Sequence, residues 1–193
     1  MDVANDDYGV TWITLDAPMI EVGGLTARML GSQTNPSIWR KHVERSQRFY
    51  SWAMNNHWGT NYRAYQQGLV TFRFILRPHR GANHGEATRL ALGQSQPLIV
   101  TQARAKRMTN RSLVKLDSDQ VLITGLKASD DGQALIVRLF NAGDKQESVR
   151  LNWGDLQPKS LWLSDTAEEN LRETGNKLDV PAHDLLTIRA ELP

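Results

Sequence analysis

The chain has 193 residues, of which 40% are hydrophobic and 23% are charged, with a formal net charge of +2. No apolar run reaches the roughly 18 residues of a transmembrane helix, so we expect no membrane partner. The chain has no cysteine, which excludes disulfides, thiolate metal sites and cysteine nucleophiles, and favours a cytoplasmic location over an oxidising compartment.

The charge is divided unevenly along the chain. Residues 1–110 hold 13 Lys and Arg against 7 Asp and Glu, a net +6, whereas residues 111–193 hold 10 against 14, a net −4. The division indicates two units with different surroundings. Because nucleic-acid binders concentrate their positive charge and this chain has only the short cluster Arg104–Met108, we expect no nucleic-acid partner.

The first half of the sequence predicts aromatic-rich strands. They cover residues 9–16, 17–24, 48–56, 70–78 and 96–103. In the third strand apolar side chains lie on both faces, so we expect coverage on both sides, with Trp52 and Met54 in a core. In the fourth, alternation with arginines points Phe72, Phe74 and Leu76 inward.

One short helix is predicted at residues 84–92. Asn83 can cap it, with Glu86 three residues later as in a capping box, and Gly93 suits the C′ position. The basic segment 105–111 has no periodicity and is the best domain boundary. We therefore divide the chain into residues 1–108 and residues 109–193.

Short strands alternate with polar turns in the second half. They cover residues 120–126, 133–141, 147–153, 159–165 and 183–191. Gly132 tolerates the positive φ of a hairpin turn, and Val149, Leu151 and Trp153 alternate with polar residues, as one buried face requires. The chain is thus predicted to be all-β: part of a large antiparallel β-sandwich with one short helix, then a small immunoglobulin-like sandwich.

No self-contained active site is evident. The sequence lacks a Gly-x-Ser-x-Gly elbow and a His-Glu-x-x-His helix, and its five histidines do not show the spacing of a zinc site. Four candidate carboxylates for glycoside hydrolysis, Asp16, Asp130, Asp131 and Asp165, are interpreted as turn residues that bond local backbone groups.

The stretch "SWAMNNHWGTNY" (residues 51–62) combines tryptophans, a tyrosine and asparagines. Aromatic faces and amides recognise sugars, because a pyranose offers a C–H face and hydroxyl groups. The same residues can instead satisfy the backbone of an irregular loop and fill a sandwich core. The candidate substrate-cleft or interdomain residues are Asn55, Asn56, His57, Trp58, Thr60, Asn61 and Tyr62.

The sequence resembles the C-terminal β-region of the glycoside hydrolase family 38 α-mannosidases. The resemblance follows one order along nearly the whole chain and is most specific in "MNNHWGTNY" followed by "FRFILRPH". Its other parts are "GVTWITLDAPMIEVG", "QPLIV" and "LIVRLFNAGDKQESVRLNWGDLQPKSLWLSD".

This resemblance implies a retaining, zinc-dependent α-mannosidase whose metal and catalytic residues lie in an N-terminal α/β-barrel, followed by a helical bundle. This chain has no counterpart of either, so we expect no catalytic residue and no metal or other cofactor in it, and no activity alone. Its expected partners are the catalytic and helical domains of the same enzyme, a mannoside substrate through that enzyme, and a further copy in a homo-oligomer, because exposed sheet edges associate. The alternative is a stand-alone carbohydrate-binding or assembly module.

Overall fold

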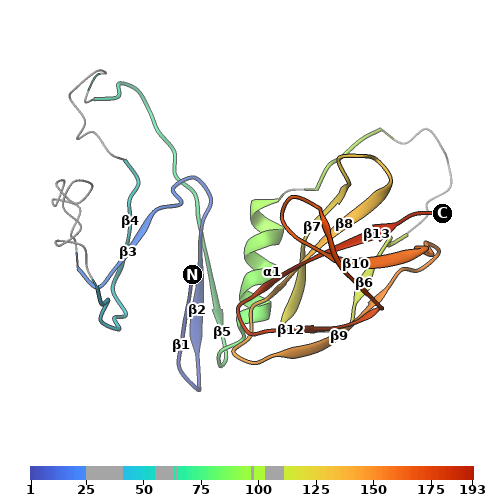
Figure 1. Cartoon of the computed structure of the whole chain (residues 1–193). Coiled ribbons are helices and arrows are strands. Elements are labelled where there is room, and N and C mark those ends of the chain that lie inside the picture. Colours follow the sequence, from blue (N-terminus) through green and yellow to red (C-terminus); the bar gives the residue numbers. More distant parts are fainter. Residues whose placement is uncertain (25–40, 55–62, 64, 97, 103–110) are drawn as a thin grey trace. The chain divides into compact units, whose positions relative to one another are not determined.

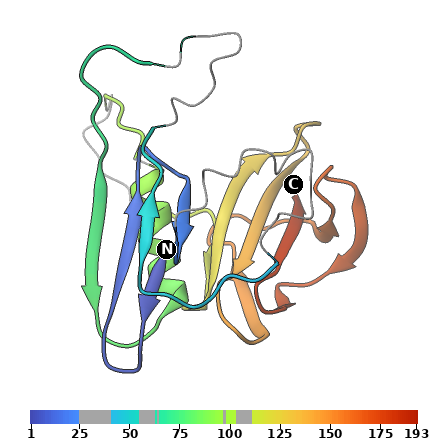
Figure 2. The same ribbon diagram turned by 90° about the vertical axis from the view of Figure 1, so that its left-hand side faces the viewer.

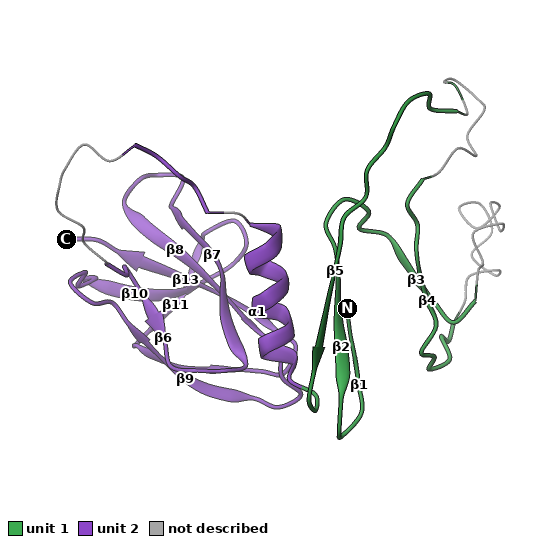
Figure 3. Ribbon diagram, turned by 180° about the vertical axis from the view of Figure 1, so that it is seen from behind, with its two compact units in different colours: residues 1–82 green, residues 83–193 purple. Residues whose placement is uncertain are grey.

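The computed structural model describes residues 1–24, 41–54, 63, 65–96, 98–102 and 111–193. These residues form two compact units, Met1–Ala82 and Asn83–Pro193 (Figure 3). The described residues form antiparallel strands and one helix, which confirms the predicted all-β class. The predicted boundary after residue 108 falls in a segment outside the described residues and stays a prediction.

The first unit contains a three-stranded sheet in the order β1-β2-β5 and a separate strand pair, β3-β4 (Figure 1). The bounds are β1 (Asp2–Ala4), β2 (Gly9–Thr14), β3 (Ile20–Val22), β4 (Phe49–Ser51) and β5 (Phe74–His79). β1 was not predicted, and β2, β3, β4 and β5 are each shorter than predicted. β2 pairs with β5 over all six residues of each strand, and this pairing is the main connection within the unit.

The buried side chains of the first unit include Trp12 and Ile13 of β2. The ring of Trp12 stacks on Phe49 at 5.2 Å and on Phe74 at 6.0 Å between centroids. The expectation that Phe74 and Leu76 point into a core is wrong, because their side chains are 43% and 66% exposed. Met54 is exposed as well, contrary to expectation. The physical reason is that the described residues supply no second layer over these side chains.

The second unit begins with the helix α1 (His84–Ser95). Its N-cap is as predicted, since the Asn83 side chain accepts a hydrogen bond from the Glu86 amide at 3.0 Å. The helix continues through Gly93 to Ser95, so Gly93 is not the C′ residue. The predicted strand at 96–103 is wrong for residues 98–102, which pair with no strand of the described chain.

Two antiparallel sheets follow the helix, in the orders β11-β10-β13-β8-β7 and β12-β9-β6. Figure 2 shows β7, β8 and β13 side by side as yellow to red arrows. The bounds are β6 (Lys115–Leu116), β7 (Val121–Ala128), β8 (Ala134–Asn141), β9 (Glu147–Asn152), β10 (Ser160–Ser164), β11 (Asn170–Thr174), β12 (Lys177–Val180) and β13 (Leu185–Glu191). β7 and β8 form the predicted hairpin, with Gly132 in its turn at a φ of 70°.

Side chains from both sheets make one hydrophobic core. Val149, Leu151 and Trp153 are buried in it, as their alternation predicted, together with Val137 of β8 and Ile188 of β13. Residues at alternate positions of facing strands meet in this way because side chains alternate between the faces of a strand. The second unit is therefore a packed β-sandwich.

No helix among the described residues is long and apolar enough to cross a membrane.

Candidate functional site

The loop singled out from the sequence lies outside the described residues, so its candidate role stays a prediction. The described chain leads into it from β4. The Trp52 amide donates to the Met19 carbonyl at 3.0 Å, and the Trp52 indole donates to the Met54 carbonyl at 2.9 Å. These bonds fix the chain just before the loop begins.

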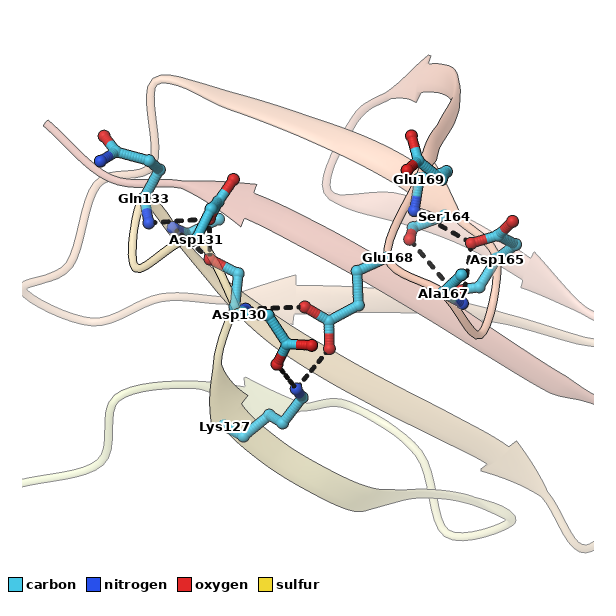
Figure 4. A network of polar contacts seen from close by, with 11 residues as sticks. Lys127, Asp130, Asp131, Gln133, Ser164, Asp165, Ala167, Glu168 and Glu169 are labelled. Atoms are coloured by element: carbon cyan, nitrogen blue, oxygen red, sulfur yellow. Dashed lines mark hydrogen bonds and ion pairs between the residues drawn. The ribbon is translucent and has the colours of Figure 1, made fainter.

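The most highly connected polar cluster of the described chain joins the β7–β8 turn to the β10–β11 turn (Figure 4). We call it the Lys127 cluster; it comprises Lys127, Asp130, Asp131, Glu168 and Arg189. The Lys127 ammonium bonds the Asp130 carboxylate at 2.7 Å and also pairs with Glu168. The Asp130 amide in turn donates to the Glu168 carboxylate at 3.0 Å. One lysine thus fastens two hairpin turns together.

The remaining acidic groups of this region are held by local bonds. Asp131 accepts from the Ser129 hydroxyl at 2.6 Å and from the Gln133 amide at 3.0 Å, and it pairs with Arg189. Asp165 accepts from two amides of its own turn. The interpretation of Asp131 and Asp165 as turn residues is therefore confirmed. Asp16 differs, since its carboxylate pairs with Arg73, 57 positions later.

Two carboxyls of the cluster have pKa values shifted downward. The Lys127 hydrogen bond, aided by the Asp130 amide, lowers the pKa of Glu168. The Ser129 hydroxyl, followed by the Gln133 amide and Arg189, lowers the pKa of Asp131. A glycosidase acid needs a carboxyl whose pKa is raised toward neutrality. The pKa values of Glu168 and Asp131 are shifted in the opposite direction, which is consistent with carboxylates that hold turns.

A second polar cluster lies in the first unit, between β1, β2 and β5. One ring nitrogen of His79 lies 2.8 Å from the Asp2 carboxylate, and the other lies 2.8 Å from the Gly81 carbonyl. The Thr11 hydroxyl donates to Asp2 at 2.8 Å. Because that hydroxyl bonds the carboxylate, the arrangement is not that of a nucleophile activated by histidine.

The close approach of Gly9 to the His79 ring leaves no room for a side chain at position 9. A Cβ at this position would lie 2.6 Å from the His79 ring, so only glycine leaves room for it. The spacing of the histidines in the sequence is not that of a zinc site, and it gives His79 no partner. It could not reveal the Asp2 partner, because the two residues are 77 positions apart and only the β1-β2-β5 pairing brings them together.

Among the described residues no group of three or more histidine, aspartate or glutamate side chains could hold a metal ion. The zinc implied by the family resemblance does not fit these residues, and we derive no step through it.

The second unit is a two-sheet antiparallel β-sandwich. Residues 120–191 match the model of the glycosyl hydrolases family 38 C-terminal beta sandwich domain. This part of the chain is a glycoside hydrolase-associated domain, and the resemblance is confirmed for it. The match covers β7 to β13.

Two further comparisons add little. No curated protein matches the chain. Among solved structures, an apo exo-carrageenase GH42 from Bacteroides ovatus matches with 15% sequence identity and a TM-score of 0.30. That match covers 42% of this chain and 11% of the carrageenase chain, and we base no argument on it.

Proposed function

We propose that the chain is the non-catalytic C-terminal β-sandwich region of a zinc-dependent retaining α-mannosidase of family 38. The family match over residues 120–191 carries this proposal. The partners are the catalytic and helical domains of the same enzyme, which act on the mannoside and bind the zinc. The role of the chain is to support those domains.

The described residues support a scaffolding role on chemical grounds. In the Lys127 cluster, Glu168 accepts from Lys127 and the Asp130 amide, and Asp131 accepts from Ser129, the Gln133 amide and Arg189. The His79–Asp2 pair has no adjacent nucleophile activated by the imidazole. Neither cluster offers the paired acid and base that glycoside hydrolysis needs.

Within this proposal, the loop at residues 55–62 adjoins the catalytic domain and contributes to the substrate cleft. Its asparagines and tryptophan would bond sugar hydroxyls and stack on a pyranose face. In the full-length enzyme, Asn56→Ala and Asn61→Ala should then lower kcat/KM for an α-mannoside and leave the melting temperature unchanged. Gln67→Ala, an exposed position nearby, is the matched control. A loss of stability with an unchanged rate would make the loop scaffolding instead.

Isothermal calorimetry of the chain alone separates the proposal from a stand-alone carbohydrate-binding module. Titration with mannose and with mannobiose should release no binding heat, because a scaffold does not bind sugar without its catalytic domain. Saturable heat at millimolar sugar would favour the stand-alone module and count against the proposal.

A further inference from the structure

The β7–β8 turn contains the dipeptide Asp131–Gly132, which is the only Asp–Gly pair of a sequence that has no Asn–Gly pair. Aspartate before glycine is especially prone to form isoaspartate, because glycine has no side chain to shield its amide nitrogen from the neighbouring carboxyl group. The turn needs a glycine here, since Gly132 has a φ of 70°, in the left-handed region that other residues rarely adopt. A reactive dipeptide is therefore built into the hairpin.

Isoaspartate forms at such a dipeptide in two steps that need no reactant other than water. In the first step the Gly132 nitrogen bonds to Cγ of Asp131 and loses its proton, while the protonated carboxyl loses its hydroxyl group, so that one water leaves. In the second step one water opens the five-membered ring at either carbonyl, which gives aspartate or isoaspartate. The protonated carboxyl reacts faster than the carboxylate, because a carboxylate is a poor electrophile.

The folded hairpin holds both reacting groups in other contacts (Figure 4). Oδ1 of Asp131 accepts from the Ser129 hydroxyl at 2.6 Å and from the Gln133 amide at 3.0 Å. Oδ2 of Asp131 accepts from Arg189 of β13. The Gly132 amide donates to the Ser129 carbonyl at 2.9 Å. Ring closure requires the carboxyl carbon to turn toward that nitrogen, so these hydrogen bonds oppose the first step.

The contact with Arg189 depends on the fold of the whole sandwich. Arg189 lies 58 positions from Asp131 in the sequence, and it reaches the turn because β13 pairs with β8. Its side chain is only 11% exposed, so the surrounding structure holds it in place. The Ser129 hydroxyl, followed by the Gln133 amide and Arg189, also lowers the pKa of Asp131, which favours the less reactive ionised carboxylate.

We infer that Asp131–Gly132 is a latent isoaspartate site, at which the folded sandwich suppresses the reaction through the contacts of Asp131 and Arg189 is a positioning residue. Opening of the β7–β8 turn releases the carboxyl and lets the reaction proceed. Isoaspartate lengthens the main chain of the turn by one carbon and displaces the carboxylate from Ser129 and Arg189. A transient opening is thereby converted into a lasting change. This inference does not depend on the proposed function.

Peptide mapping of the intact chain after prolonged incubation at neutral pH tests the suppression directly. Electron-transfer fragmentation in a mass spectrometer distinguishes isoaspartate from aspartate at position 131. The wild-type chain is incubated folded in buffer and unfolded in guanidinium chloride. Isoaspartate should accumulate several-fold more slowly in the folded chain, because the hairpin holds the carboxyl and the amide apart. Equal rates in the two states would overturn the inference, and this comparison needs no variant.

Arg189→Met tests the role of the arginine, and Lys127→Met is its matched control, because Lys127 pairs with Asp130 and Glu168 and not with Asp131. In the folded state Arg189→Met should form isoaspartate faster than the wild type, whereas Lys127→Met should match the wild type. In guanidinium chloride all three chains should react at one rate, which shows that the difference arises from the fold. If Arg189→Met is folded by circular dichroism and reacts no faster than the wild type, the inference is wrong.

Discussion

Asn141, at the end of β8, connects the two sheets of the sandwich and is fully buried. Its side-chain amide donates to the Val180 carbonyl of β12 at 3.0 Å and to the Lys145 carbonyl at 2.8 Å. Its carbonyl oxygen accepts from the Gly143 amide at 2.9 Å. Asn141→Ala removes all three bonds and takes away the acceptor of the buried Gly143 amide.

The expected loss follows from the Gly143 amide. A buried donor left without its acceptor costs about 1–3 kcal/mol, so Asn141→Ala should lower the free energy of unfolding by roughly 2–3 kcal/mol. Asn141→Asp keeps the acceptor but directs a buried carboxylate at two carbonyl oxygens. Burial beside these carbonyls raises the folded-state pKa of the new carboxyl. The loss in free energy of unfolding relative to the wild type should therefore be largest at neutral pH and shrink as the pH falls toward about 4.

Urea unfolding followed by tryptophan fluorescence measures the effect, with the slope m required to stay constant across the variants. Asn152→Ala is the matched control. Asn152 is exposed and accepts one bond, from the Gly154 amide at 3.0 Å, so water can replace its side chain and the loss should stay below about 1 kcal/mol. If Asn141→Ala costs no more than Asn152→Ala, the reasoning about buried, unpaired backbone groups is wrong.

Two glycines of α1 should respond to alanine with opposite signs. Gly85→Ala would place a Cβ 2.0 Å from the Asp119 carbonyl oxygen, so it should destabilise the fold by about 1–3 kcal/mol. At Gly93 an added Cβ meets no neighbour within 4 Å, so Gly93→Ala should stabilise the fold by up to about 1 kcal/mol. Thermal melts by circular dichroism give both values, and equal effects would contradict the close approach at Gly85. Asp16 should make the stability of the fold depend on pH. A hydrogen bond from the Arg73 side chain and a weaker one from the Arg73 backbone amide lower the pKa of Asp16 from 3.8 to about 2. A carboxyl whose folded-state pKa is lowered stabilises the fold above its unfolded-state pKa, so this stabilisation should be lost as the pH falls from about 4 to about 2. When stability is measured against pH, Asp16→Asn should lack the part of the fall between about pH 4 and about pH 2. Lys127→Met should leave the chain folded, with a urea midpoint close to that of the wild type, because Lys127 lies at a partly exposed site where ion pairs contribute little. A clear fall in the urea midpoint would mean that the cluster is essential to the sandwich.

The second unit could be predicted from the sequence in most of its elements because its structure depends on local patterns. Alternation in Val149, Leu151 and Trp153 identified the buried face of β9, and the glycine of the β7–β8 turn identified the hairpin. The helix cap at Asn83 followed from its spacing to Glu86. Each of these signals lies within a few residues of the structure that it specifies.

The first unit was predicted less well because its structure depends on partners far along the chain. The alternation that pointed Leu76 inward is real, but burial needs a second layer, and the described residues supply none. The ion pair of Asp16 with Arg73 and the bond of His79 to Asp2 both span more than 50 positions. Spacing in the sequence carries no information about such pairs. The same holds for residues 98–102, where an apolar pattern predicted a strand but no strand of the described chain pairs with it.

The central claim is that this chain is the non-catalytic part of a family 38 α-mannosidase, and hydrolysis of an α-mannoside measures it most directly. The purified 193-residue chain should be compared with the protein encoded by the whole reading frame around it, each with and without zinc. We predict that the longer protein cleaves 4-nitrophenyl α-mannoside only with zinc, and that the chain alone is inert under both conditions. Hydrolysis by the chain alone, or inertness of the longer protein toward α-mannosides in the presence of zinc, would contradict the account.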